Sequence, residues 1–138
     1  MKVVIPGQPV GKGRPRFARA GKFVRTYTPP KTAAWEASAI ALMRLHHEGP
    51  PIDGPVQVLV TAVGQRPKRM MRRKDPAGRM WRCNKPDGDN VLKAVCDAMV
   101  NAGVVVDDTH CVDMRVLSVY AAKDEAPCVD VIWGRLYT

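Results

Sequence analysis

The sequence has no long hydrophobic run, and this absence excludes one class of protein. A segment that spans a bilayer needs about 18 to 20 consecutive apolar residues, and no run of that length occurs in the 138 residues. Residues 1–6 contain a lysine and lead directly into glycine and proline, without the apolar stretch of a secretory signal. We therefore expect a cytoplasmic protein with no membrane partner.

Closely spaced cysteines are missing as well. The four cysteines lie 13 to 17 residues apart, and three histidines are the other soft metal ligands. A structural zinc site normally shows close pairs of ligands, about two to four residues apart. The spacing argues against zinc and predicts reduced, mostly buried thiols, the usual state in a reducing compartment.

Acidic residues are scarce in the first 86 positions. These positions hold 18 of the 22 Lys and Arg but only 4 of the 13 Asp and Glu, a net charge of +14. Residues 87–138 hold the other 4 basic and 9 acidic residues, a net charge of −5. A basic part attracts phosphates and an acidic part attracts cations. Nucleic acid is therefore the expected partner.

Two segments carry most of the positive charge, and both are predicted to be loops. Residues 2–31 hold eight basic side chains and no acid, and residues 65–85 hold nine against a single Asp75. Loops this long in a small domain are usually functional, although a merely solvated loop is the alternative. Phosphate contacts from such loops would position DNA. The candidate DNA-binding residues are Lys12, Arg14, Arg16, Arg19, Arg66, Lys68, Arg69, Arg72, Arg73 and Lys74.

Hydrophobic periodicity predicts one α/β domain over residues 1–138. Strands are expected over residues 1–5, 56–62, 112–121 and 128–137. Helices are expected over residues 33–45 and 89–102. Thr28 would cap the first helix ahead of two prolines, and Gly103 would end the second. This order of elements fits an α+β arrangement, with two helices packed on a mixed, mostly antiparallel sheet of about four strands.

Residues 85–93, Lys-Pro-Asp-Gly-Asp-Asn-Val-Leu-Lys, carry the candidate chemistry together with an Asp-Asp pair at residues 107–108. Asp87 and Asp89 lie at a tight turn that enters a helix, so both can point at one small volume, and the Asp-Asp pair can supply a third carboxylate from a neighbouring element. Mg²⁺ takes one or two carboxylates and keeps waters for substrate phosphates. Capping is the alternative, because Asp is common at helix N-caps and in turns. Like charges gathered in a basic protein favour the cation site.

These residues resemble the core signature of the RusA family. The signature D-x-D-N-x-x-K-x-x-x-D-x-L, then a glycine and an apolar stretch that ends in D-D, matches residues 87–99 and 102–108. Residues 12–17, Lys-Gly-Arg-Pro-Arg-Phe, and the Tyr-Thr-Pro at 27–29 resemble the phage and prophage branch of that family. Met99 stands where the family often has Leu, and Gly88 where other members have a bulkier residue.

The resemblance implies a homodimeric, Mg²⁺-dependent endonuclease of a bacterial or phage-infected cell, with Mn²⁺ as a second cation. It would resolve four-way DNA junctions, or Holliday junctions, by paired symmetric nicks in recombination and repair. By motif, Asp87, Asp89 and Asp108 would hold the metal and, with Lys93, form the catalytic set; the role of Asp107 is open. The alternative function is a phage protein that binds branched DNA without catalysis.

The size of the chain also favours a dimer. A chain of 138 residues with two long polar loops gains stability when it buries an edge strand or a face against a second copy. The face around Trp133 and Tyr137 is the candidate interface.

Overall fold

The computed structural model describes the backbone of residues 1–12 and 16–137, and the side chains of these residues except 16, 17, 20 and 25. Its main element is a five-stranded sheet in the order β1-β7-β4-β6-β5. The strands are β1 (Lys2–Pro6), β4 (Val56–Gly64), β5 (Met80–Trp81), β6 (Cys111–Tyr120) and β7 (Cys128–Arg135). The β4–β6 pair is parallel and the other three pairs are antiparallel. The mixed, mostly antiparallel sheet is confirmed, with the short β5 added to the four expected strands.

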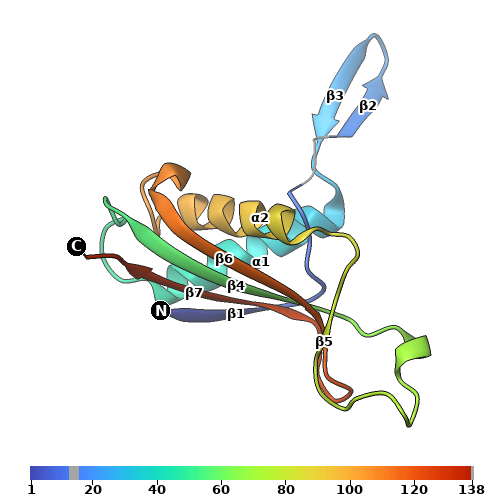
Figure 1. Ribbon diagram of the computed structural model, residues 1–138. Helices are drawn as coiled ribbons and strands as arrows, with labels where there is room; N and C mark the ends of the chain where they lie inside the picture. The colour runs from blue at the N-terminus through green and yellow to red at the C-terminus, as the bar shows by residue number, and fades with distance from the viewer. Residues whose placement is uncertain (13–15, 138) are drawn as a thin grey trace.

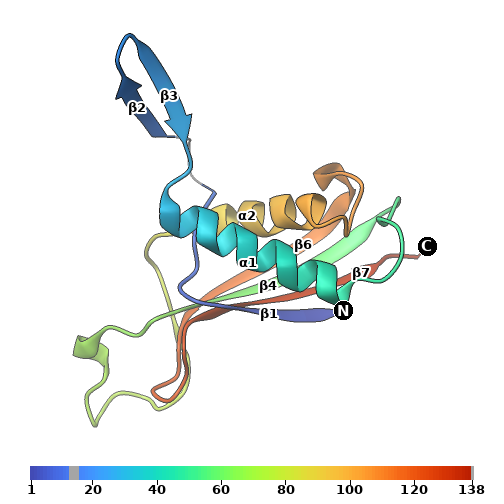
Figure 2. The same ribbon diagram turned by 180° about the vertical axis from the view of Figure 1, so that it is seen from behind.

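Two helices cover one face of this sheet (Figures 1 and 2). They are α1 (Pro30–His46), which lies over β1, and α2 (Gly88–Asn101), which lies over β6. Alternate residues of β4, from Val56 to Ala62, are buried against them. The helices contribute residues such as Trp35, Met43 and Met99 to the same core. Burial of this apolar surface, at roughly 25 cal/mol per Å², is the main force that holds the layers together.

The ends of the helices differ in how well the sequence predicts them. Gly103, with φ 76°, directly follows the C-cap Ala102 of α2, as expected. The expected cap of α1 is wrong: its N-cap is Pro29, not Thr28, and no side chain caps it. Pro30 at the first helical position removes one of the N–H groups that a cap would satisfy, so α1 begins without one.

The first predicted loop is instead partly a β-hairpin. Its strands β2 (Arg16–Ala20) and β3 (Phe23–Tyr27) pair antiparallel and form a two-stranded sheet of their own. Gly21, at φ 64°, and Lys22 form the two-residue turn, whose first position suits glycine. The hairpin projects away from the helices (Figure 1), so the expectation of a continuous loop is corrected.

The second predicted loop forms an arm over residues 65–79, which contains a short 3-10 helix, η1 (Lys68–Met70), and leads into β5. The arm projects from the same end of the domain as the hairpin, on the opposite side of the helical layer (Figures 1 and 2). Among the predicted DNA-binding residues, Arg66 lies at the base of this arm and is buried, with 6% of its surface exposed.

The guanidinium of Arg66 holds the arm together from inside. It donates hydrogen bonds to the carbonyl oxygens of Ala121, Met70 and Pro76, at 3.0, 3.3 and 2.6 Å, and to that of Gly78. A buried cation needs such partners, because desolvation without them costs several kcal/mol. The prediction that Arg66 binds DNA is therefore corrected: it is a structural residue.

The four cysteines are free, and Cys96, Cys111 and Cys128 are buried, as expected, while Cys83 is exposed. Burial raises the pKa of Cys128 to about 11, so this thiol stays neutral near pH 7. No helix in the described part of the chain is long and apolar enough to cross a bilayer.

Candidate active site

An acidic pocket of about 260 Å³ lies between α2 and β6. Its lining residues are Asp89, Leu92, Lys93, Cys96, Asp97, Asp108 and Met114. Three predicted catalytic residues therefore meet in one cavity although they come from two separate elements. Asp89, Lys93 and Asp97 reach the pocket because residues four apart on a helix share one face. Asp97 lines the same pocket although it is not in the predicted catalytic set.

Asp108 enters the pocket from a short 3-10 helix, η2 (Asp108–His110), which directly precedes β6. The preceding Asp107 shapes this turn, because its carboxylate accepts hydrogen bonds from the Asp108 N–H and the Thr109 hydroxyl, both at 2.9 Å. These hydrogen bonds lower the pKa of Asp107, and the one from Thr109 has the largest effect. Asp107 is thus occupied as a cap.

The electrostatics of Asp108 differ from those of its neighbour. A side-chain hydrogen bond with Asp107 and the negative charge of Asp107 raise the pKa of Asp108, and the charge of Asp97 acts in the same direction. Like charges disfavour ionisation of the group they surround. A bound cation would remove that penalty, so the pocket is electrostatically suited to one.

Asp87 lies at the margin of this site. It is the N-cap residue of α2, but its side chain accepts no capping hydrogen bond, and it is exposed. It is absent from the residues that line the acidic pocket. The structure therefore offers no support for the capping alternative at Asp87, and it does not bring Asp87 together with Asp89 and Asp108.

Gly88 permits the close approach of α2 to β6. A Cβ atom at this position would lie 3.2 Å from Cγ1 of Val116. A side chain here would require Val116 or the first turn of α2 to shift slightly. The departure from the family signature at this position therefore has a packing explanation in this chain.

The donor set of the acidic pocket fits a hard divalent cation. Carboxylate oxygens are the ligands that Mg²⁺ and Mn²⁺ prefer, and Mg²⁺ needs only one or two from the protein. Within the described residues, no three His, Cys, Asp or Glu side chains are close enough together to hold a metal ion. Asp89 and Asp108, the two predicted ligands that line the pocket, therefore have no third such side chain close by among the described residues.

Lys12, a predicted DNA-binding residue, lies beside this site. Its ammonium forms ion pairs with Asp97 at 3.0 Å and with Glu36 at 3.8 Å, and its N–H donates to the carbonyl of Asn90. The hydrogen bond with Asp97 raises the pKa of Lys12. Sequence reasoning missed this pairing, because the partners are distant in the chain.

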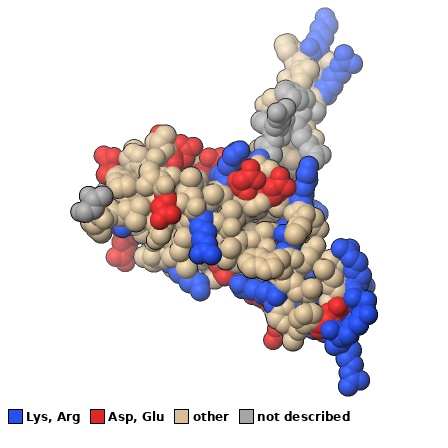
Figure 3. Space-filling view, viewed as in Figure 1, with Lys and Arg blue, Asp and Glu red and all other residues tan. Residues whose placement is uncertain are grey.

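The other predicted DNA-binding residues are concentrated on the two projections. Arg19 is exposed on the hairpin, and Lys68, Arg69, Arg73 and Lys74 are exposed on the arm. Figure 3 shows the basic surface of both projections, with acidic patches on the body of the domain. These cations are exposed, and their contact with DNA phosphates stays a prediction.

Three further predicted DNA-binding residues are either paired or outside the described side chains. Arg72 is exposed, but its guanidinium is paired with Asp75 at 3.1 Å, which offsets part of its charge. Arg14 lies outside the described residues, and the side chain of Arg16 does too.

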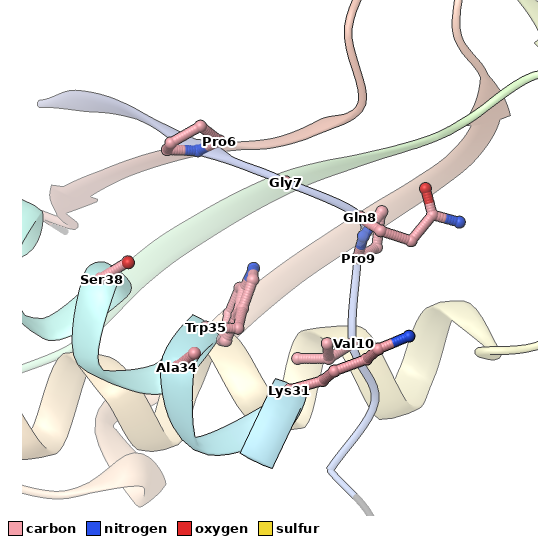
Figure 4. Close-up of a pocket in the computed structure, with 9 residues that line it drawn as sticks. All are labelled: Pro6, Gly7, Gln8, Pro9, Val10, Lys31, Ala34, Trp35 and Ser38. Carbon is pink, nitrogen blue, oxygen red and sulfur yellow. The ribbon is translucent and has the colours of Figure 1, made fainter.

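A second cavity, of about 490 Å³, lies between α1 and the chain that leaves β1 (Figure 4). Its lining residues are Pro6, Gly7, Gln8, Pro9, Val10, Lys31, Ala34, Trp35 and Ser38. No carboxylate is among them. This cavity lies at the β1 side of the sheet, whereas the acidic pocket lies at the β6 side, so it is no part of the candidate metal site.

The chain is similar in sequence to a known protein family and to individual relatives. Residues 6–131 match the family model of endodeoxyribonuclease RusA. The chain is 30% identical over 137 residues to the uncharacterized protein YqaN of Bacillus subtilis (strain 168). This match covers 96% of this chain and 94% of YqaN. It is also 32% identical over 84 residues to a crossover junction endodeoxyribonuclease RusA of Aquifex aeolicus (strain VF5). That match covers 61% of this chain and 54% of the relative.

Proposed function

This chain belongs to the RusA family of endodeoxyribonucleases, and on that premise we propose that it cuts four-way DNA junctions with the carboxylates of the acidic pocket. The observation that carries this proposal is the meeting of Asp89, Lys93 and Asp108 in one cavity. Helix α2 and η2, the turn that follows it in the chain, supply them. The proposed reaction is hydrolysis of one phosphodiester in each of two symmetric strands, in recombination and repair.

Asp89 and Asp108 are the proposed metal ligands, with Mg²⁺ as the cation and Mn²⁺ as a substitute. Asp87 completes the proposed set, because the family signature includes it and its exposed carboxylate makes no capping bond. When bound, the cation would polarise the phosphodiester and lower the pKa of a water, which provides hydroxide near neutral pH.

Lys93 is the proposed electrostatic residue. It lies one turn after Asp89 on the pocket face of α2 and is exposed. A phosphodiester under attack gains negative charge, and a fixed ammonium stabilises that charge more than it stabilises the ground state. Lys93 thus binds and orients the phosphate that is cut.

The arm and the hairpin are the proposed DNA-binding surface. Phosphate contacts position DNA without reading sequence, which suits a substrate that is recognised by its branched shape. Residues Arg19, Lys68, Arg69, Arg73 and Lys74 are the exposed candidates. Because both projections leave the same end of the domain (Figure 1), one DNA molecule can meet both.

We further propose a two-fold dimer, because a four-way junction is approximately two-fold symmetric and needs two equivalent cuts. The expected interface around Trp133 is corrected, since Trp133 is 3% exposed and belongs to the core. Tyr137 is exposed, and the sheet face without helices carries exposed Val4 and Ile132. Sedimentation should report about twice the 15.2 kDa chain mass; a monomer that makes paired cuts would contradict the dimer.

The decisive experiment incubates the purified protein with an end-labelled four-way junction and with a linear duplex of the same sequence. Mg²⁺ or Mn²⁺ should give symmetric nicks in the junction alone, and EDTA should give none. A protein that only binds branched DNA would shift the junction in a gel and leave it intact. The nuclease proposal would be refuted if neither cation supported cutting and if Asp89→Asn bound junctions as the wild type does.

A further inference from the structure

Lys12 joins the chain after β1 to α1 and to α2, the helix that lines the acidic pocket. It lies between β1 and the hairpin, and its N–H donates to the Asn90 carbonyl of α2 at 3.0 Å. Its ammonium reaches Asp97 on α2 at 3.0 Å and Glu36 on α1 at 3.8 Å. One residue thus fixes the chain that leads to the hairpin against both helices.

Gly11 strengthens this connection by its packing. A Cβ atom at Gly11 would lie 3.2 Å from the Cβ atoms of both Asn90 and Pro86, so the backbone is pressed against the start of α2. Pro86 and Asn90 flank the segment 87–89, which carries two proposed metal ligands. We call Gly11 and Lys12 the hairpin root, because the projecting hairpin follows them in the chain.

We propose that Lys12 is a positioning residue, which ties α2 to α1 and to the chain that leaves β1 and so holds the carboxylates of α2 in place for the phosphate that is cut. This inference rests on the proposed nuclease function and deepens it. It also replaces the expectation that Lys12 is a phosphate contact, because two carboxylates already share its ammonium.

The effect should appear in the rate of cutting and not in folding. The side chains of Lys12 and Asp97 are 44% and 38% exposed, and ion pairs this exposed contribute little to stability. The reacting phosphate, in contrast, must be placed within a fraction of an ångström, and a shift of about 1 Å can cost roughly 100-fold in rate. A small loss of order at the root is therefore magnified in catalysis.

The first test is Lys12→Met, with Lys31→Met as the matched control at the start of α1. Lys31 is exposed, and no ion pair is found for it among the described residues. Junction affinity is measured in EDTA, and the single-turnover rate is measured with Mg²⁺ at saturating protein. Lys12→Met should cut roughly 10- to 100-fold more slowly with affinity within about twofold of the wild type. Lys12→Arg should recover most of the rate, and Lys31→Met should match the wild type.

The second test keeps the charge and disturbs the packing. Gly11→Ala should lower the rate as Lys12→Met does, because the new Cβ forces the root away from Pro86 and Asn90. The double variant Lys12→Met with Asp97→Asn should be no slower than the slower single variant, since both remove the same contact. Thermal melting serves as the folding control for each protein.

Several outcomes would overturn the proposal. If Lys12→Met loses affinity but cuts at the normal rate, Lys12 is a phosphate contact. If the losses in the double variant are additive, Lys12 acts without Asp97. If Lys12→Met fails to fold, a normal rate for Gly11→Ala decides against the proposal. If the wild type cuts nothing, the nuclease function fails. Hydrogen exchange then still tests the root, because Lys12→Met should speed exchange of the residue 12 amide, which donates to the Asn90 carbonyl in the wild type.

Discussion

The arm and the acidic pocket hold their charges in opposite ways. In the arm, the protein itself supplies partners: four carbonyl oxygens surround Arg66, and Arg79 pairs with Glu125 at 2.6 Å. In the pocket, carboxylates lie beside one another, and the pKa of Asp108 is raised. Charged side chains whose partners come from the protein itself have a structural role. Carboxylates that repel one another within the fold are suited to bind a cation from outside.

The largest effect that tests this contrast is loss of a pocket carboxylate. Asp89→Asn and Asp108→Asn should each lower the cutting rate roughly 100- to 1,000-fold or more, because each removes charge where the cation and phosphate meet. Junction binding should persist or tighten, since one negative charge near the DNA is gone. Asp97→Asn is the comparison and should be milder. Near-normal cutting by either main variant would remove that residue from the site.

The second effect concerns the arm. Arg66→Met should lower the free energy of unfolding by about 3 kcal/mol or more, because it leaves buried carbonyl oxygens without donors. Urea unfolding measures this loss, and limited proteolysis should show new cleavage between residues 65 and 79. The nearby Lys68→Met removes an exposed cation and should change stability by no more than about 0.5 kcal/mol. Equal stabilities for the two variants would show that Arg66 is not structural.

A smaller effect separates the free cations of the arm from the paired one. Charge reversal of Arg73 and Lys74 together should weaken junction binding and flatten the slope of log affinity against log salt by about 2. Arg72→Met should change that slope less than Arg73→Met, because Asp75 already offsets the charge of Arg72. Titrations at several salt concentrations measure both. A slope that none of these changes alters would place the DNA elsewhere.

The sequence predicts the body of this domain well, and physical reasons explain where it fails. Period-2 patterns locate β4 and β6, and Gly103 ends α2 as expected, because these features depend on local structure. The sequence does not predict the hairpin, because the high charge of β2 and β3 hides their strand pattern. The short turn between them is enough to pair the two strands. Arg66 was misassigned, because a sequence does not show which of several neighbouring arginines is buried.

The site shows the same division. The signature predicts that Asp87, Asp89, Lys93 and Asp108 belong together, and of these the structure places all but Asp87 in the lining of one pocket. The pairing of Lys12 with Asp97 and Glu36 depends on how α1 and α2 pack, and no spacing within the chain indicates it.

The smallest effect is a shift in pH dependence that originates in Asp107. Asp108 must be ionised to hold a cation, and its raised pKa means that metal binding fails at a higher pH than for an ordinary aspartate. Asp107→Asn keeps an oxygen that can accept from the Asp108 N–H but removes the neighbouring charge. The pKa of Asp108 should therefore fall, and the acid limb of the cutting rate should move to lower pH. Carbon-13 NMR titration of the Asp108 carboxyl in the metal-free protein reads the pKa directly. Thr109→Val is the control, because it removes a hydrogen bond that lowers the pKa of Asp107 and leaves the charge of Asp107 in place. An acid limb that stays fixed in Asp107→Asn would mean that Asp107 does not control the ionisation of Asp108.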